Sequence, residues 1–331
     1  MPQAPIKQKN LIMNKKDLKI VFFGTPEFAV ASLDRLISGG YNVAAVVTMP
    51  DKAAGRGHKM IKSDVKVYAE EKELPLLQPE KLKSEEFVNA LRKINADLFI
   101  VIAFRMLPEI VWNMPRLGTF NLHGSLLPKY RGAAPINRAI MNGEKETGIT
   151  TFFLKHEIDT GDMIEQRRTV IADNDNAGTV HDRLMEMGAE MVESTVKKIL
   201  DGTLETHPQP SGDFIGAPKI FKEDCEIDWN SPAEKIHNQV RGLSPYPAAF
   251  STVTESNGKN FNAKIFETAL TEISSKTETP GTVMINDRRM FVATSDYYIE
   301  IKALQPAGKK RMETNAFLLG YKPLKFEKTD K

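Results

Sequence analysis

Residues 19–48, which read KIVFFGTPEFAVASLDRLISGGYNVAAVVT, give the clearest indication of the fold. The apolar run at the start of this stretch predicts a buried strand that stops at Gly24. A helix is expected next, because apolar residues recur at helical spacing, Thr25 can cap the first turn, and Pro26 suits the first helical position. A glycine pair then ends the helix, and a second apolar run predicts another strand. The order strand, helix, strand favours parallel pairing of the two strands.

The same alternation continues to about residue 200. Further strands are expected at 75–78, 97–103, 118–123 and 148–154, and further helices at 64–74, 84–94, 133–141 and 177–200. Alternation of this kind predicts an α/β domain with a Rossmann-like, doubly wound and mostly parallel sheet. Ligands of such sheets bind beyond the carboxyl ends of the strands, so the functional residues are expected there.

The chain divides into four expected segments. Residues 1–17 are polar and lysine-rich, which predicts a flexible N-terminus, and residues 18–202 form the α/β domain. Residues 203–221 contain several prolines and glycines without an apolar period, which predicts a linker. In residues 222–331, short apolar runs separated by turn residues predict a small β-barrel, with a β-sandwich as the alternative.

The overall composition excludes several classes of protein. The single cysteine, Cys225, can form neither an internal disulfide nor a cysteine-based zinc site, so a reducing cytoplasm is the expected location. The most apolar segment, residues 98–104, is too short to cross a membrane, and the first residues do not resemble a signal-peptide core. The 45 Lys and Arg residues nearly balance the 43 Asp and Glu residues, so any binding of a polyanion has to come from local clusters of charge.

Two polar side chains converge at the end of a predicted strand. Asn121 and His123 lie two residues apart, so they share one face of the strand, and Gly124 marks its carboxyl end. An amide and an imidazole can both donate hydrogen bonds to an oxyanion that develops on an attacked carbonyl, and imidazole can transfer protons near neutral pH. The alternative is structural, with the amide bonded to backbone at the sheet end and the histidine packed as an ordinary side chain.

A polar turn at residues 156–162 supplies a third candidate, Asp159. Its carboxylate could support a charge on His123 or accept a proton from an amine, although turn chemistry explains most such residues. The glycine pattern of dinucleotide-binding proteins does not follow Gly24, which disfavours NAD. No metal is expected, because the histidines are too scattered for a metal-ligand motif, at positions 58, 123, 156, 181, 207 and 237.

At these same residues the sequence resembles the folate-dependent formyltransferases. Asn121, His123 and the SLLP run at residues 125–128 are similar to the family signature, and DTGD at residues 159–162 is similar to its second catalytic loop. Further stretches resemble the branch of the family that acts on methionyl-tRNA, at residues 23–28, 50–57, 130–135, 228–229 and 244–247.

The resemblance implies transfer of a formyl group from 10-formyltetrahydrofolate to the α-amino group of methionine carried by initiator tRNA, without a metal. Asn121 and His123 would stabilise the oxyanion, and His123 would also protonate the departing folate nitrogen. Asp159 would orient or charge the histidine and relay the proton that the amine loses. The pterin would meet backbone near residues 104–107, where Arg105 is bulkier than is usual in the family. The wall of the folate pocket would consist of Ser125, Leu126, Leu127 and Pro128.

The resemblance also implies that the carboxyl-terminal domain is an OB-like barrel that supports initiator methionyl-tRNA. The expected tRNA-binding residues form a basic loop, which contains Lys52, Arg56, His58, Lys59 and Lys62. A lysine-rich loop that is merely solvated is the alternative. Residues 302–331 are also basic, with eight Lys or Arg residues against three acids. A cytoplasmic monomer without a membrane partner is expected.

Three alternatives remain open at this point. A formyltransferase acting on an amino sugar nucleotide would share the catalytic segment and even an OB-like second domain. A glycinamide ribonucleotide enzyme fits less well, because that family resembles the first domain alone and usually has proline at the position of Gly124. A non-catalytic folate-binding or RNA-binding module is the third alternative, and the intact Asn121, His123 and Asp159 argue against it.

Overall fold

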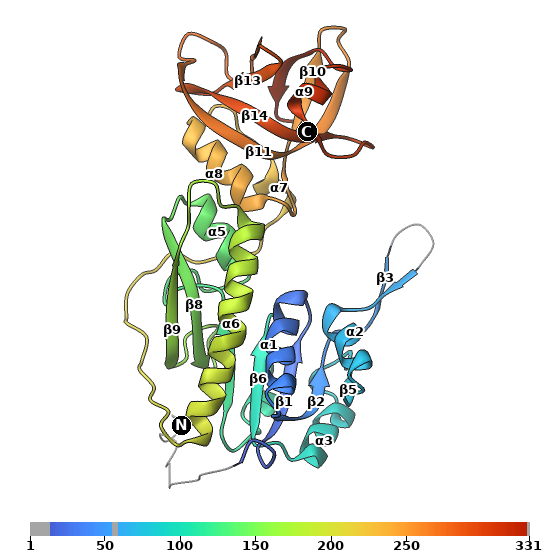
Figure 1. Cartoon of the computed structure of the whole chain (residues 1–331), viewed down its shortest axis with the longest axis vertical. Coiled ribbons are helices and arrows are strands. Elements are labelled where there is room, and N and C mark those ends of the chain that lie inside the picture. The colour runs from blue at the N-terminus through green and yellow to red at the C-terminus, as the bar shows by residue number, and fades with distance from the viewer. Residues whose placement is uncertain (1–13, 55–58, 330–331) are drawn as a thin grey trace. The chain divides into compact units, whose positions relative to one another are not determined.

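The computed structural model describes residues 14–54 and 59–329, so most of the expected flexible segment 1–17 lies outside the described residues. The chain forms two compact units (Figure 1). The first unit contains the residues up to 131 together with 148–169 and 181–215. The second unit contains 132–147, 170–180 and the residues from 216 onward. Each unit is therefore built from separate stretches of the sequence.

A seven-stranded sheet forms the centre of the first unit, in the order β5-β2-β1-β6-β7-β8-β9. The strands are β1 (Lys19–Gly24), β2 (Asn42–Val47), β5 (Leu76–Leu77), β6 (Leu98–Ile102), β7 (Thr119–His123), β8 (Glu146–Phe153) and β9 (Met163–Val170). The pairs from β5 to β7 are parallel, and β7 pairs with β8 in the antiparallel direction. The predicted doubly wound, mostly parallel sheet is confirmed.

Helices of the first unit follow the predicted positions. They are α1 (Glu27–Ser38), α2 (Asp64–Glu71), α3 (Glu85–Ile94) and α6 (Ala177–Leu200), with a short α4 (Glu109–Trp112) that the sequence pattern did not indicate. Side chains of β1, β2 and β6 pack with those of α3 in one apolar core, which includes Phe23, Phe87 and Phe99. This core fixes the strand ends at which ligands of such sheets bind.

The cap of α1 differs from the prediction. Pro26, not Thr25, is the N-cap residue, and the buried Thr25 hydroxyl has no hydrogen-bond partner among the described residues. The Asp64 carboxylate at the start of α2 accepts a hydrogen bond from the Glu27 N–H at 3.0 Å. An anionic acceptor near a helix N-terminus is favourable, so a residue distant in sequence replaces the local cap.

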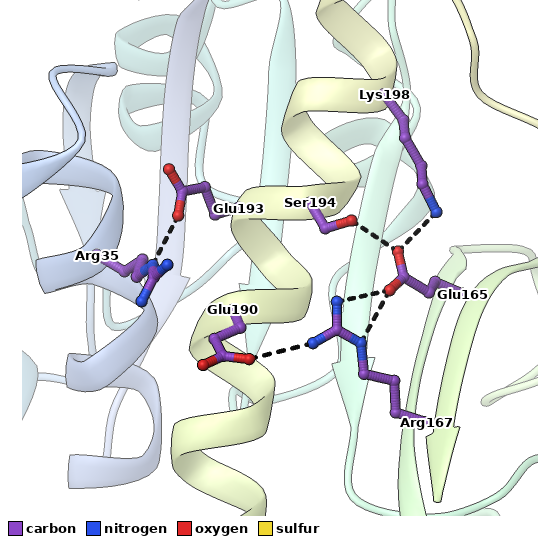
Figure 2. A network of polar contacts seen from close by, with 7 residues as sticks. All are labelled: Arg35, Glu165, Arg167, Glu190, Glu193, Ser194 and Lys198. Carbon is purple, nitrogen blue, oxygen red and sulfur yellow. Dashed lines mark hydrogen bonds and ion pairs between the residues drawn. The ribbon is translucent and has the colours of Figure 1, made fainter.

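A polar network joins α6 to β9 and to α1 (Figure 2). The Glu165 carboxylate accepts hydrogen bonds from Arg167 at 2.8 Å, Lys198 at 2.7 Å and Ser194 at 2.9 Å. On the α1 side, Arg35 pairs with Glu193 at 2.6 Å. Burial of Glu165 opposes its ionisation, but the hydrogen bonds from Lys198, Arg167 and Ser194 outweigh burial and lower the pKa of its carboxyl.

Replacing Glu165 with glutamine is expected to lower the free energy of unfolding at neutral pH by about 1–2 kcal/mol, because the partly exposed cations Arg167 and Lys198 lose a charged hydrogen-bond acceptor. The folded chain has the lower pKa at Glu165, so the stabilisation is complete above the pKa of the unfolded chain and is lost as the pH falls through the folded pKa. Urea unfolding at several pH values measures this loss. The control is Glu190→Gln, which removes a 58% exposed carboxylate and should change stability by less than about 1 kcal/mol. A difference between Glu165→Gln and the wild type that persists unchanged in acid would contradict the assignment.

The second unit contains an antiparallel barrel with the strand order β12-β13-β14-β11-β10-β16 (Figure 1). Its strands are β10 (Ala249–Glu255), β11 (Asn260–Ser274), β12 (Val283–Asn286), β13 (Arg289–Ala293), β14 (Tyr297–Pro306), β15 (Met312–Glu313) and β16 (Pro323–Glu327). An isolated antiparallel bridge between Thr282 and Lys325 brings the two ends of the order together. The predicted barrel is confirmed, and the sandwich alternative is not adopted.

The helices of the second unit each supply side chains to the barrel core. They are α5 (Pro135–Met141), α7 (Lys222–Cys225), α8 (Ala233–Leu243) and α9 (Thr314–Phe317). Ile236 and Val240 of α8 lie fully buried with the barrel strands, and Cys225 is buried in the same cluster. Although α5 lies far before the barrel in the sequence, Asn137 donates a hydrogen bond to the Gly242 carbonyl at 2.8 Å. Packing against α8 therefore places α5 in the second unit.

Candidate active site

Strand β7 presents Asn121 and His123 on one face, as their spacing predicts. β7 lies between β6 and β8, with Asn121 opposite Val101 on one side and Phe152 on the other. The Asn121 side chain is half-buried and makes no hydrogen bond to another of the residues that the structure describes. His123 is buried, with 7% of its surface exposed. The amide of Asn121 is thus available to a ligand at the carboxyl end of the parallel strands.

The ring of His123 is held between two loops. Its Nε2 donates a hydrogen bond to the carbonyl oxygen of Tyr130 at 2.8 Å, and because a carbonyl only accepts, the proton of the neutral ring lies on Nε2. The basic nitrogen is then Nδ1, which lies 3.8 Å from Oδ2 of Asp159. The unprotonated nitrogen of the neutral ring is therefore directed toward a carboxylate.

The loop between β8 and β9 places Asp159. This residue has a left-handed backbone with φ of 55°, which is uncommon outside glycine. Nearby, a Cβ built on Gly161 would lie 1.5 Å from the Phe153 carbonyl oxygen, so no larger residue fits where the loop approaches the end of β8. Lys155 and Asp162 close the loop with an ion pair at 2.8 Å. The structure thus brings Asp159, which is distant in the sequence, next to His123 on the strand that also carries Asn121.

The SLLP run forms a tight turn after β7. The Ser125 hydroxyl is fully buried and donates to the Lys129 carbonyl at 2.7 Å, so this hydroxyl supports the turn. Leu127 is also buried, and its carbonyl accepts a hydrogen bond from Gln166 at 3.0 Å. Leu126 and Pro128 are half-buried. Of the four residues expected at the folate pocket, these two have exposed side-chain surface for a ligand.

The segment that follows β6 ends at the same edge of the sheet. The ring of Phe104 packs edge-on against Phe23 at 5.7 Å between centroids. The guanidinium of Arg105 donates to the carbonyls of Pro79 and Glu80, while its buried Nε has no partner among the described residues. Burial lowers the pKa of Arg105. This bulky side chain therefore links two loops at the strand ends.

The expected tRNA-binding residues lie on or near a small hairpin of β3 (Lys52–Ala54) and β4 (Lys59–Ile61), which Figure 1 shows at the edge of the first unit. Arg56 and His58 lie outside the described residues, and Lys59 belongs to β4. Lys52 is exposed. Lys62 is paired with Glu70 at 2.6 Å, and this hydrogen bond raises the pKa of Lys62.

One residue at this site lies in the segment that we expected to be a linker. Gln209 contacts the backbone of the Asp159 loop and the side chain of Arg131. The flanking Pro208 and Pro210 restrict the backbone at this position, but no sequence pattern relates Gln209 to partners 48 to 78 residues away.

Metal sites and membrane helices are both missing from residues 14–54 and 59–329. In these ranges no group of three or more His, Cys, Asp or Glu side chains could hold a metal ion. None of the helices described in the same ranges has the length and apolar character needed to span a bilayer.

Burial raises the pKa of Cys225, so its thiol is a poor nucleophile.

Comparisons with known proteins show which family the chain resembles. The formyl transferase family model matches residues 18–196, and the model of the formyl transferase C-terminal domain matches residues 219–322. A methionyl-tRNA formyltransferase of Bacteroides fragilis is 56% identical over 316 residues, which cover 93% of this chain and 97% of the relative. One of Bacteroides thetaiotaomicron is also 56% identical, covering 94% and 98%. The solved N-formyltransferase of Helicobacter canadensis shares the fold, with a TM-score of 0.62 at 20% identity over 87% of this chain and 99% of that chain. The chain belongs to the formyl transferase family.

Proposed function

We propose that the chain transfers the formyl group of 10-formyltetrahydrofolate to the α-amino group of methionine on initiator tRNA. The product is N-formylmethionyl-tRNA, used in translation initiation. The observation that carries this proposal is the site itself: an available Asn121 amide beside His123, whose basic nitrogen faces Asp159 at 3.8 Å. The acceptor is proposed from the relatives that are 56% identical across nearly the whole chain and are named methionyl-tRNA formyltransferase.

Asn121 acts on the charge that develops during the reaction. As the amine nitrogen bonds to the formyl carbon, negative charge grows on the formyl oxygen. The Asn121 amide donates a hydrogen bond to that oxygen, and His123 adds a second donor from the same face of β7 once its Nδ1 has received the proton that the amine loses. These contacts are stronger in the transition state than in the ground state, so they accelerate the chemical step.

His123 and Asp159 transfer a proton from the attacking amine to the leaving folate nitrogen. The attacking amine loses one proton, which Asp159 accepts directly or through water, and the bond between the formyl carbon and the folate nitrogen breaks. Asp159 passes the proton of the amine to Nδ1 of His123, and the ring gives it to the leaving folate nitrogen. The separation of 3.8 Å between Nδ1 and Oδ2 allows this exchange after a small movement or through one water molecule.

The remaining roles are assigned to segments of the chain. We assign residues 18–202 to the catalytic domain, 203–221 to a linker, and 222–331 to an OB-like domain that supports tRNA. The turn at residues 125–128 forms a wall of the folate pocket, and the pterin meets backbone near residues 104–107. We further propose that the protein acts in the cytoplasm as a monomer and needs no metal.

A competition between two acceptors tests which of them the enzyme formylates. The purified chain is supplied with 10-formyltetrahydrofolate and a mixture of methionyl-initiator tRNA and a nucleoside-diphosphate amino sugar, and both products are quantified. We expect formylation of the methionyl-tRNA and none of the sugar. Formylation of the sugar in preference to the tRNA would overturn the proposal and favour the amino sugar alternative.

Replacing Arg56 and Lys59 together with glutamine is expected to weaken tRNA binding, because two cations that can contact phosphates are removed. The slope of log Kd against log salt should fall by about 0.7–0.9 for each phosphate that the variant no longer neutralises. Filter binding at four salt concentrations measures the slope, and folate binding should not change. The control pair, Lys83→Gln with Lys93→Gln, removes the same charge from exposed positions near α3. Equal slopes for the wild type and the Arg56 and Lys59 variant would assign the hairpin to solvated surface.

A further inference from the structure

Both polar atoms of the Gln209 carboxamide form hydrogen bonds within the first unit. Its Nε2 donates hydrogen bonds to the Asp159 carbonyl at 2.8 Å and the Gly161 carbonyl at 2.9 Å. Its Oε1 accepts from the Arg131 guanidinium, at 3.1 Å from Nε and 2.6 Å from Nη2. Carbonyls only accept and a guanidinium only donates, so the partners fix the orientation of the amide. Only a carboxamide offers two donors and an acceptor oxygen in this arrangement.

The two loops that Gln209 joins are the ones that hold His123. Tyr130, directly before Arg131, accepts the hydrogen bond from Nε2 of the ring, and Asp159 faces Nδ1. Both Tyr130 and Asp159 have positive φ, at 61° and 55°. Residues other than glycine hold this backbone only where surrounding contacts enforce it, and the Gln209 carboxamide is a contact next to each of them.

The segment that carries Gln209 is itself anchored on both sides. His207 exchanges two backbone hydrogen bonds with Met163 at the start of β9, at 2.8 and 2.9 Å. Farther along, the Ile215 carbonyl accepts a hydrogen bond from the Tyr130 N–H at 2.6 Å. Gln209 is half-buried between the exposed Pro208 and Pro210, whose rings limit the freedom of the backbone. A segment that is anchored on both sides therefore holds the carboxamide at the site.

We propose that Gln209 is a positioning residue of the formyl transfer site: its carboxamide ties the Asp159 loop to Arg131 and so fixes both loops around His123. This inference rests on the proposed function. Gln209 touches neither substrate in this account, and its effect passes through the placement of Asp159 and Tyr130. A displacement of about 1 Å at a reacting group can cost about 100-fold in rate, so loss of the tie should appear in kcat.

The test compares Gln209→Met, which keeps the size but removes every hydrogen bond, with Gln209→Glu, which keeps the acceptor toward Arg131 but places an oxygen against two carbonyls. Both variants should lower kcat by about 10- to 100-fold and change the KM of each substrate by less than about threefold. The control is Thr206→Ala, an exposed position in the same segment, which should retain wild-type kcat. If Gln209→Met does not fold, Gln209→Asn, which keeps the amide but shortens its reach, replaces it.

Nitrogen-15 spectra of the histidine rings separate positioning from general destabilisation. The His123 signals, assigned by their loss in His123→Gln, should shift in Gln209→Met at a temperature where the variant is fully folded. Wild-type kcat in Gln209→Met with unshifted His123 signals would overturn the proposal. A wild-type protein that formylates no acceptor would overturn the proposed function instead, and the spectra would still report whether Gln209 fixes the surroundings of His123.

Discussion

Replacing Asn121 with alanine is expected to lower kcat by about 100- to 1000-fold, which is the usual cost of removing one donor to a developing oxyanion. The Kd for tRNA should change by less than about threefold, because the amide acts on charge that is present only in the transition state. The half-buried position of Asn121, without a partner among the described residues, implies little loss of stability. Steady-state kinetics and direct tRNA binding, measured on the same preparation, test both expectations. His123→Ala should show the same separation of turnover from affinity.

The control for this experiment is Asn89→Ala, which removes an exposed asparagine on α3 and should leave kcat within about twofold of the wild type. An Asn121→Ala variant that loses turnover and tRNA affinity to the same extent would mean that Asn121 contributes to uniform binding. In that case, its role as a donor to the oxyanion would be wrong.

Gly161→Ala is expected to have the second large effect. The added Cβ would meet the Phe153 carbonyl oxygen at 1.5 Å, and backbone at the end of β8 cannot give way as a flexible side chain could. The loop that carries Asp159 must then move away from the end of β8. We expect kcat to fall by about 100-fold, with a loss of about 1–3 kcal/mol in the free energy of unfolding.

Urea unfolding and kinetics on one preparation measure both changes for Gly161→Ala. Gly320→Ala is the matched control, because nothing lies within 4 Å of a Cβ built there, and it should leave activity and stability near those of the wild type. Wild-type kcat in Gly161→Ala would show that the position of the Asp159 loop does not limit the reaction.

Much of the fold could be predicted because local patterns agree with tertiary packing. The helix at 177–200 has the predicted bounds, since its apolar spacing matches the side that packs in the protein. The hairpin of β3 and β4 was expected to be a loop, because three-residue strands carry too few residues to show alternation. The Thr25 prediction was wrong, since Asp64, 37 residues away from Glu27, supplies the acceptor.

The candidate site, like the fold, could be predicted only in part from the sequence. The alternation of side chains along β7 is enough to place Asn121 and His123 on one face. The polar turn at residues 156–162 made Asp159 a candidate, but its approach to His123 depends on the path of a loop with a left-handed backbone, which the sequence pattern does not specify. The contacts of Gln209 could not be predicted, because they require the chain to return along β9 after α6.

In the proposed reaction, this site moves a formyl group from folate to the amine of methionyl-tRNA. The most direct measurement follows the label from 10-formyltetrahydrofolate carrying carbon-14 in the formyl group, with methionyl-initiator tRNA in excess over enzyme. We predict that the label appears in N-formylmethionine after mild hydrolysis of the tRNA, at a rate that falls about 100- to 1000-fold in Asn121→Ala. Label that remains on the folate, or that is released as formate without reaching the methionine, would show that the enzyme does not formylate methionyl-tRNA.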